Sequence, residues 1–229
     1  MNQNYENLLS QLHCNKGVII CCGAHFSSYE LMGHQLVRGL LNNADSTSQR
    51  VVNLCTSESD CLLITPNCNH STLNFSVSKF GDFKRYKYAL RYCSRTSSDI
   101  ITITKFDELS LEEMHDFRRM SETSICIADS ATNDISAVID SLETRFQNED
   151  VSELVNFVTQ LRAIVGTRKA YRAKGTGYTH DVLVVSEEML FQLNKLQTVE
   201  QICDELRSYT SQLSRIEFEP LFVMQYPAA

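Results

Sequence analysis

Short apolar runs alternate with amphipathic stretches along most of this chain of 229 residues. A strand buried on both faces of a sheet gives a continuous apolar run, whereas a helix repeats its apolar residues every three or four positions. The runs predict strands at 17–22, 50–55, 61–65, 72–80, 99–104, 124–129 and 178–185. Helical spacing predicts helices at 30–42, 84–94, 111–120, 135–146, 151–165 and throughout 187–213, and either a short helix or an ordered lead-in at 4–13.

Polar side chains mark several of the predicted boundaries. Ser110 and Glu113 have the spacing of a capping box, in which each side chain satisfies a free amide at a helix start. Thr132, Asn133 and Asp134 offer capping oxygens before the next helix. The regular alternation of strands and helices predicts a three-layer α/β domain with a helical end.

The charge balance excludes several classes of protein. The chain has 21 basic and 28 acidic residues, and its net charge of −7 disfavours binding to nucleic acid or to an anionic membrane surface. The same charge favours a neutral or basic protein partner. No apolar run approaches the roughly 20 residues of a spanning helix, so direct membrane insertion is not expected.

The cysteine pattern bears on the cellular compartment. Nine cysteines are an odd number and include no CxxC pair, so a disulfide framework is not expected. The segment 1–12 lacks a basic region followed by a long apolar stretch, so no signal peptide is expected either. These features predict a reducing, cytoplasmic location.

Histidine and cysteine come close together in two places. Cys61, Cys68 and His70 form one group, and His25 follows an adjacent cysteine pair. The spacing does not match a compact zinc knuckle, and no local feature marks one cysteine as activated. We therefore expect buried structural thiols, with no metal site and no Cys–His nucleophile.

Basic and aromatic residues are interleaved in one predicted helix. The residues are Lys84, Arg85, Lys87, Arg91 and Arg95 with Tyr86, Tyr88 and Tyr92. A solvated face and a subunit-contact face both fit this pattern, and the solvated face is the simpler interpretation.

The segment at 17–31, GVIICCGAHFSSYEL, has the form of a strand, a loop and a helix. Such a loop can hold phosphate on the exposed amides of the helix N-terminus. The segment resembles the Walker A region of the type II/type IV secretion and pilus ATPases, in which a strand is followed by GPTGSGKST and a helix. Gly23 and Ser27 match that motif.

Three other positions of the motif differ. Ser28 replaces the glycine before the lysine, Tyr29 replaces the phosphate-gripping lysine, and Glu30 replaces the Mg²⁺-ligating hydroxyl. A carboxylate at Glu30 would repel a triphosphate by an energy on the order of several kcal/mol before screening. A simpler interpretation makes Gly23 a turn glycine, Tyr29 a packed aromatic residue and Glu30 a favourable anion at a helix start, and it agrees with loss of catalysis.

Later landmarks of the same family follow in order. The segment YALRYCSRTSSDIITITKFDEL is similar to the region that the family writes ALR…DPDVILVGEMRD. Asp99 begins the predicted strand at 99–104, which corresponds to the strand that carries the family's Walker B glutamate. Lys105 occupies the position of that glutamate. The simplest interpretation of Lys105 is a solvated residue at a strand end.

Two more segments complete the resemblance. TSICIADSATNDISAVIDSL is similar to GHLVLSTLHTNSA with its following helix, and it keeps Thr132 and Asn133 while Ala131 replaces the histidine. The stretch FVTQLRAIVGTRKAYRAKGTGYTHDVLVVSEEMLFQL resembles the family's LR…QR…G…EILV…NLI close and retains Arg162 and Arg168.

On these landmarks the chain is identified as a divergent, motif-degenerate member of that ATPase family. The resemblance covers about residues 15–196 and implies a RecA-like P-loop core with a mixed, mostly parallel sheet. It divides the chain into a short lead-in at 1–14, a RecA-like core with a degenerate nucleotide site at 15–150, and a C-terminal strand and helical part of the same domain at 151–229.

Phosphoryl transfer needs positive charge on the phosphates, a held Mg²⁺ and an acidic group that orients water. All three are missing at the aligned positions, so the resemblance implies a non-enzymatic assembly subunit with no catalytic residues and no ATP or Mg²⁺. Its partners would be protein components of a secretion or pilus machine, a related active ATPase among them, in homo- or hetero-oligomers held at the inner membrane through those partners.

Two alternatives stay open. One is an active but atypical ATPase that draws its cation from Lys16, Lys105 or Arg119. The other is a sensor that binds nucleotide without cleaving it. ATP and Mg²⁺ would be cofactors only under these alternatives.

Overall fold

The computed structural model describes residues 16–23, 32–43, 48–55, 71–76, 85–172 and 175–218. Their strands form one eight-stranded sheet in the order β3-β2-β4-β5-β1-β6-β7-β8. The strands are β1 (Gly17–Cys22), β2 (Arg50–Cys55), β3 (Ser71–Ser76), β4 (Ile100–Ile103), β5 (Ile125–Asp129), β6 (Leu161–Arg172), β7 (Gly175–Val184) and β8 (Ser214–Phe218). Neighbours from β3 to β6 are parallel, and β7 and β8 are antiparallel to theirs, so the sheet is mixed and mostly parallel.

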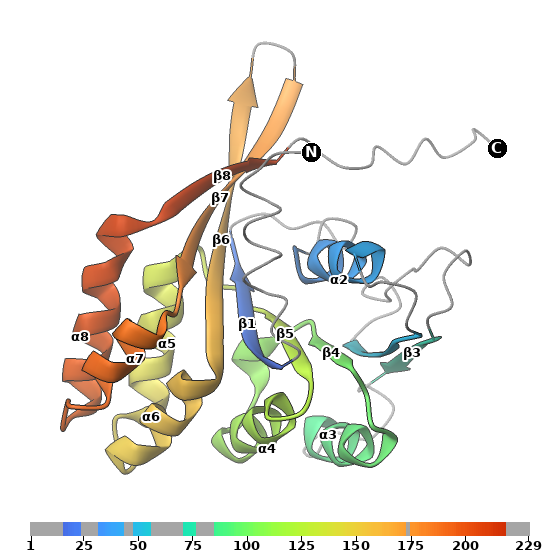
Figure 1. Cartoon of the computed structure of the whole chain (residues 1–229), viewed down its shortest axis with the longest axis horizontal. Coiled ribbons are helices and arrows are strands. Elements are labelled where there is room, and N and C mark those ends of the chain that lie inside the picture. The colour runs from blue at the N-terminus through green and yellow to red at the C-terminus, as the bar shows by residue number, and fades with distance from the viewer. Residues whose placement is uncertain are drawn as a thin grey trace.

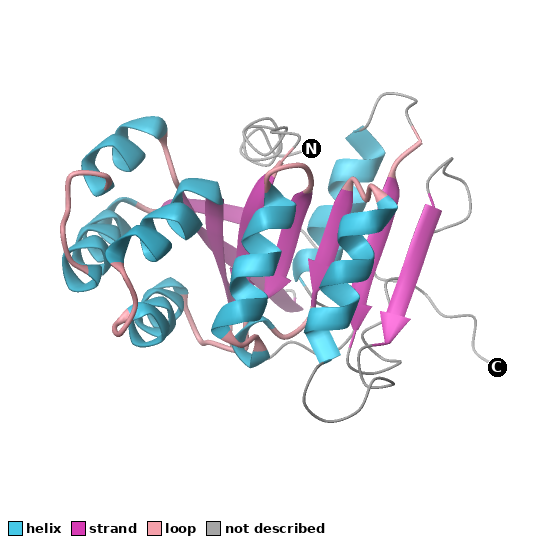
Figure 2. Cartoon of the chain, turned by 90° about the horizontal axis from the view of Figure 1, so that it is seen from below, coloured by secondary structure: helices cyan, strands magenta, loops and turns pink. Residues whose placement is uncertain are grey.

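Helices pack on both faces of the sheet and give three layers, as Figure 1 and Figure 2 show. The helix α2 (Met32–Asn43) covers one face. The other face carries α3 (Arg85–Thr96), α4 (Leu111–Ser121), α5 (Ile135–Phe146), α6 (Val151–Gln160), α7 (Glu187–Leu193) and α8 (Val199–Tyr209). Two short 3₁₀ turns, η3 (Phe106–Glu108) and η4 (Thr210–Gln212), precede α4 and β8. The predicted RecA-like α/β architecture is confirmed.

The central strand β1 shows why this chain needs continuous apolar runs. All six of its residues are buried. Val18 and Ile20 belong to the core beneath α3 to α8, whereas Ile19 and Cys21 belong to the core beneath α2. Because successive side chains point to opposite faces and both faces are covered, the strand has no position at which a polar side chain meets solvent.

Many predicted elements are confirmed. The strands at 17–22 and 50–55 and the helix at 135–146 have the predicted bounds. The short helix or lead-in predicted at 4–13 and the strand predicted at 61–65 lie outside the described residues.

The helix caps predicted before α4 and α5 are present, and one of them also links α4 to α3. Ser110 Oγ accepts from the Glu113 amide at 3.3 Å, and Glu113 Oε2 accepts from the Ser110 amide at 2.8 Å. Glu113 Oε1 accepts from the Lys87 amide at 2.9 Å, so the same carboxylate links α3 to α4. Asp134 caps α5 by accepting from the Ala137 amide at 2.9 Å.

The helix predicted at 151–165 is wrong in its second half. The helix α6 ends at Gln160, and the chain continues as the strand β6. Leu161 and the run from Ala163 to Val165 are buried beside β1. A helical spacing continues through Leu154, Val158, Leu161 and Val165, which is why the pattern alone predicted a longer helix. The chain becomes a strand here because its backbone hydrogen-bonds to β1.

The prediction of a helical tail at 187–213 also needs correction. The helix α7 ends at Leu193, and Thr198 caps a second helix by accepting from the Gln201 amide at 3.2 Å. The strand β8, which no sequence pattern indicated, then pairs with β7. The described part of 151–229 therefore contributes three strands, β6, β7 and β8, to the one sheet, in addition to its helices.

The described cysteines fit the expectation of structural thiols. Cys21, Cys22, Cys93, Cys126 and Cys203 are buried and form no disulfide. Among the described helices, none is both long enough and apolar enough to span a bilayer.

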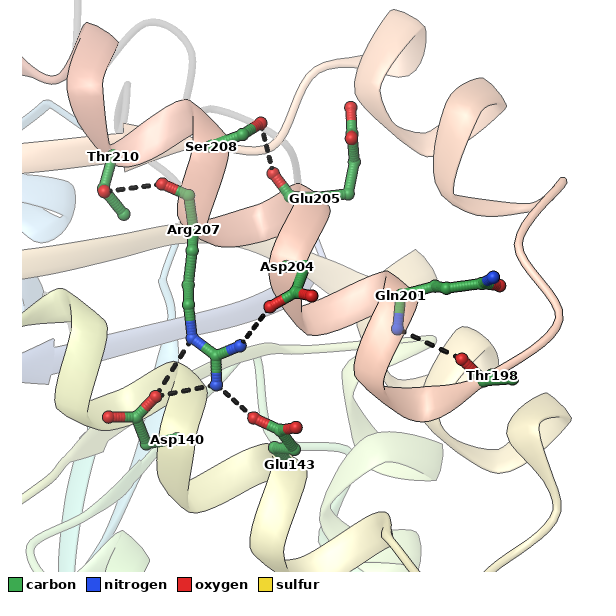
Figure 3. Close-up of polar contacts among 9 residues, drawn as sticks. All are labelled: Asp140, Glu143, Thr198, Gln201, Asp204, Glu205, Arg207, Ser208 and Thr210. Carbon is green, nitrogen blue, oxygen red and sulfur yellow. Dashed lines mark hydrogen bonds and ion pairs between the residues drawn. The ribbon is translucent and has the colours of Figure 1, made fainter.

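A cluster of ion pairs fastens α8 to α5 (Figure 3). Arg207 of α8 donates to Asp140 Oδ1 from Nη2 at 2.8 Å and also reaches Glu143 on α5. Its Nη1 donates to Asp204 Oδ1 at 2.7 Å. Donation to Glu143, and then to Asp140, raises the pKa of the Arg207 guanidinium. We call this cluster the Arg207 clamp.

Replacing Arg207 with alanine leaves three carboxylates facing one another. We expect the free energy of unfolding to fall by about 1–2 kcal/mol, because repulsion replaces attraction. Urea denaturation at low salt and at about 1 M NaCl measures the loss, which shrinks in high salt as charges are screened. Arg119→Ala is the control, since Arg119 is 69% exposed and has one pair of 3.7 Å. Equal losses in the two variants would contradict the clamp.

Candidate functional site

The parallel strands β4, β5 and β1 bring their carboxyl ends to one edge of the sheet. Cys21 of β1 is paired with Asp129 of β5, and Ile103 of β4 is paired with Ala128. The loops that follow these strands therefore begin side by side. In open α/β sheets this carboxyl edge is where ligands bind.

Gly23 leaves β1 at this edge with φ +152°, a conformation that L side chains rarely adopt. Its amide donates to the Thr132 carbonyl at 2.9 Å, and the Ser130 amide donates to the Cys21 carbonyl at 2.7 Å. The loops after β1 and β5 are thus joined by backbone hydrogen bonds. Gly23 is a turn glycine whose amide already has an acceptor.

Four other Walker A positions were selected from the sequence. Ser27, Ser28, Tyr29 and Glu30 lie outside the described residues.

Asp129 ends β5 and places a buried carboxylate against α2. Its side chain is in a residue only 6% exposed, and Oδ1 accepts from the Gly33 amide at 3.0 Å. A Cβ at Gly33 would lie 2.6 Å from Asp129 Oδ2, so glycine permits this close approach. An amide in the first described turn of α2 therefore binds an anion that belongs to the protein itself.

Asp107 of η3 provides a second carboxylate at the edge. Its Oδ1 accepts from Ser130 Oγ at 2.9 Å, and its Oδ2 accepts from the Ala131 amide. Arg145 of α5 donates to the carbonyl oxygens of Asp107 and Leu109 rather than to the carboxylate. Asp107 thus ties the loop after β4 to the loop after β5.

Two described cations at this edge, Lys105 and Arg168, are paired with carboxylates. Lys105 is exposed, as expected, and its Nζ lies 2.8 Å from Glu108 Oε1. Arg168 of β6 is paired through Nε with Asp181 Oδ2 at 3.0 Å. Arg168, Asp181 and Asn133 line a pocket of about 120 Å³ beside the start of α5. Asn133 and Arg168, two positions selected from the sequence, are therefore neighbours.

Three other sequence candidates lie at the opposite edge. Asp99 precedes β4, and its Oδ2 accepts from the Arg50 amide at 2.7 Å, a structural role. Lys16 precedes β1, and Arg119 lies in the last turn of α4, shortly before β5 begins. Lys16 and Arg119 are therefore separated from the carboxyl edge by the length of a strand, too far to contact a nucleotide bound there. Of the three cations proposed for an atypical ATPase, only Lys105 lies at the carboxyl edge.

The remaining titratable groups near the site offer no nucleophile. Burial raises the pKa of the Cys22 thiol to about 12, so it stays protonated. Burial lowers the pKa of His180 to about 4, and its Nδ1 lies 2.9 Å from Thr167 Oγ1. Among the described residues no three His, Cys, Asp or Glu side chains gather as metal ligands. Cys61, Cys68, His70 and His25, weighed above, lie outside them.

Sequence reasoning missed Asp107, Asp129 and Asp181. The signal for Asp129 was visible, since this carboxylate directly follows the apolar run ICIA. Asp107 and Asp181 carried no comparable signal, because their roles depend on contacts with residues distant in the sequence.

Known structures share this architecture. DotB, an ATPase of Legionella pneumophila, has a TM-score of 0.73 and 13% identity over 91% of this chain and 56% of its own. The pilus retraction motor PilT with bound ADP has a TM-score of 0.63 and 16% identity over 91% of this chain and 62% of its own. The VirB11 ATPase of the Brucella suis type IV secretion system has a TM-score of 0.54 and 16% identity over 80% and 52%.

The fold is that of the secretion and pilus ATPases. The resemblance seen in the sequence is thereby confirmed at the level of fold. The chain spans just over half the length of the DotB chain that it matches. No protein-family model matches the sequence, and no curated protein shows significant similarity to it.

Gly33→Ala tests the close approach of Asp129 to α2. Alanine within an ordinary helix stabilises by about 0.5–1 kcal/mol relative to glycine. Here we expect a loss of about 1–2 kcal/mol, because the new Cβ meets the carboxylate. In an Asp129→Ala background the clash is gone, so Gly33→Ala becomes neutral or stabilising there. Urea denaturation of wild type, the two single variants and the double variant measures the free energy of unfolding of each. If the effects of the two substitutions on that free energy simply add, the contact is refuted.

The buried His180 predicts a pH dependence of stability. Its folded pKa of about 4 lies below the ordinary 6.5, so the unfolded chain takes up the proton more readily. The stabilisation that neutral His180 gives the folded protein is complete above pH 6.5 and is lost as the pH falls toward 4. We expect wild type to lose on the order of 2 kcal/mol more than His180→Gln between pH 7 and pH 4, measured by urea denaturation. Parallel pH profiles for the two proteins would contradict the assignment.

Proposed function

We propose that this protein is a divergent, motif-degenerate relative of the secretion and pilus ATPases that does not hydrolyse ATP. It acts by protein–protein interaction in a type IV pilus, secretion or conjugation apparatus. The shared fold with DotB, PilT and VirB11 supports the type of apparatus.

The carboxyl edge of the sheet carries the argument against hydrolysis. Asp107, Asp129 and Asp181 occupy this edge, while Lys105 and Arg168 are each paired with a carboxylate. A triphosphate requires unengaged cations and amides, because catalysis of phosphoryl transfer consists mainly of positioning and charge stabilisation. To bind nucleotide here, the protein would have to break these contacts and accept repulsion from the carboxylates left behind.

The partners in this proposal are protein components of the machine, including a related active ATPase. Homo- or hetero-oligomers and a cytoplasmic position, peripheral to the inner membrane through partners, follow from the same role. The net charge of −7 argues against nucleic acid as the main ligand.

Two alternatives differ in their use of nucleotide. An active atypical ATPase would have to release Lys105 from Glu108. A sensor would place an anion at the small pocket of Arg168 and Asn133, where Asp181 already neutralises the guanidinium. Both alternatives place the nucleotide beside a cation that is already paired with a carboxylate.

Thermal unfolding with Mg²⁺-ATP, with Mg²⁺-ADP and without nucleotide tests the proposal, together with phosphate release from the same sample. We expect no release and a Tm change of less than about 1 °C at millimolar nucleotide. A ligand at a hundred times its Kd stabilises by about 2.7 kcal/mol, which corresponds to several degrees.

The other outcomes separate the alternatives. A shift of several degrees without phosphate release, abolished by Arg168→Ala, would establish a sensor. Phosphate release that Lys105→Ala abolishes would overturn the proposal in favour of an atypical ATPase. Lys16→Ala is the matched control, since this exposed lysine lies at the opposite edge.

A further inference from the structure

The exposed surface of α3 carries tyrosine and arginine in an ordered stripe. Tyr88, Arg91, Tyr92 and Arg95 are spaced i, i+3, i+4 and i+7, so they share one face of the helix. Tyr88 and Tyr92 are 46% and 43% exposed. Tyr92 stacks on Phe75 of the edge strand β3 with ring centroids 5.4 Å apart. We call these four side chains the Tyr–Arg stripe.

The stripe has the composition of a contact surface. Tyrosine and arginine are, with tryptophan, the residues enriched at the energetic centres of protein interfaces. In the described part of the chain neither Arg91 nor Arg95 has an ion-pair partner. The helix α3 has four basic residues and no acidic one. A purely solvated face would require no such regular pairing of aromatic and cationic side chains.

A groove of about 590 Å³ lies at the opposite end of the sheet, between the end of α5 and the starts of α6 and α8. Glu149, Asp150 and Glu200 line it, with Val151 and Val199 providing apolar surface. In the described residues the carboxylates of Glu149 and Glu200 have no ion-pair partner. Residues 135–160 and 187–213 together hold ten acidic and three basic residues. We call this feature the acidic groove.

The Arg207 clamp holds the walls of the acidic groove. Arg207 binds Asp140 and Glu143 on α5 and Asp204 on α8, so the two helices that form the groove are fixed to each other (Figure 3). The clamp satisfies those three carboxylates and leaves the groove carboxylates for another cation. A groove formed before binding costs less ordering entropy when a partner enters.

The two surfaces cannot meet within one molecule. Figure 1 shows α3 and β3 at one end of the sheet and α7 and α8 at the other. A contact between the Tyr–Arg stripe and the acidic groove must therefore join two copies, and because the surfaces differ, the contact is head to tail.

We infer that the Tyr–Arg stripe of one copy docks into the acidic groove of a second copy. Arg91 and Arg95 pair with Glu149 and Glu200, and the tyrosine rings lie against the apolar residues of the groove. Opposite charge on the two surfaces favours this register over contacts between like surfaces. The inference rests on the proposed function only in that the protein acts through protein contacts, and it needs no assumption about nucleotide.

Sedimentation velocity without nucleotide tests the inference over about 1–200 µM protein. Variant A is Arg91→Gln with Arg95→Gln, and variant B is Glu149→Gln with Glu200→Gln. We expect the average mass of wild type to rise with concentration beyond that of a dimer, and association to weaken by about tenfold or more in A, in B and in about 500 mM NaCl. The control, Lys16→Gln with Arg119→Gln, changes net charge as A does and associates like wild type.

An equimolar mixture of A and B gives the sharpest result. A keeps the groove and B keeps the stripe, so the mixture forms a heterodimer and nothing larger. A monomeric wild type, self-association of B equal to that of wild type, or a mixture that stays monomeric would each overturn the inference. Binding of labelled single-stranded DNA to a monomeric wild type, lost in A, would also overturn it and assign the stripe to nucleic acid. Phosphate release would overturn only the proposed function.

Discussion

Hydrogen bonding of β1 to β5 on one side and β6 on the other is the interaction on which the rest of the structure depends. The strand is buried at the centre of the sheet and separates the two cores. Its register with β5 fixes where the loops after both strands begin, so the Gly23 amide reaches the Thr132 carbonyl and the Ser130 amide reaches the Cys21 carbonyl at one edge. Without this pairing, the carboxylates of the candidate site would have no common position.

The side chains at the carboxyl edge of the sheet differ from those of a phosphate-binding site. In a phosphate site, amides and cations surround an anion supplied by the ligand. Here the protein supplies the anions: Asp129 binds an amide of α2, Asp107 binds the loop after β5, and Asp181 binds Arg168. These contacts are internal and need no ligand, which supports a role in which the fold is kept and nucleotide is not required.

Local signals predicted most elements, and contacts distant in sequence decided the rest. The box of Ser110 and Glu113 is readable because both partners lie within one turn. Residues 161–165 satisfy a helical period, and only their place beside β1 makes them a strand. Lys105 was predicted as a solvated strand-end residue and is exposed, whereas its pairing with Glu108 required the conformation of η3. Asp181 could not be assigned from sequence, because the antiparallel pairing of β7 with β6 brings it to Arg168.

Charge is distributed unevenly along the sheet. The proposed loss of hydrolysis and the proposed self-association therefore depend on different parts of the molecule. The proposed loss of hydrolysis rests on carboxylates in η3, at the end of β5 and within β7, whereas self-association rests on α3 and on the helices around the acidic groove. The two sets share no residue. A head-to-tail assembly would use neither the loops after β1, β4 and β5 nor the pocket beside Arg168, so the carboxyl edge would stay available to a different protein.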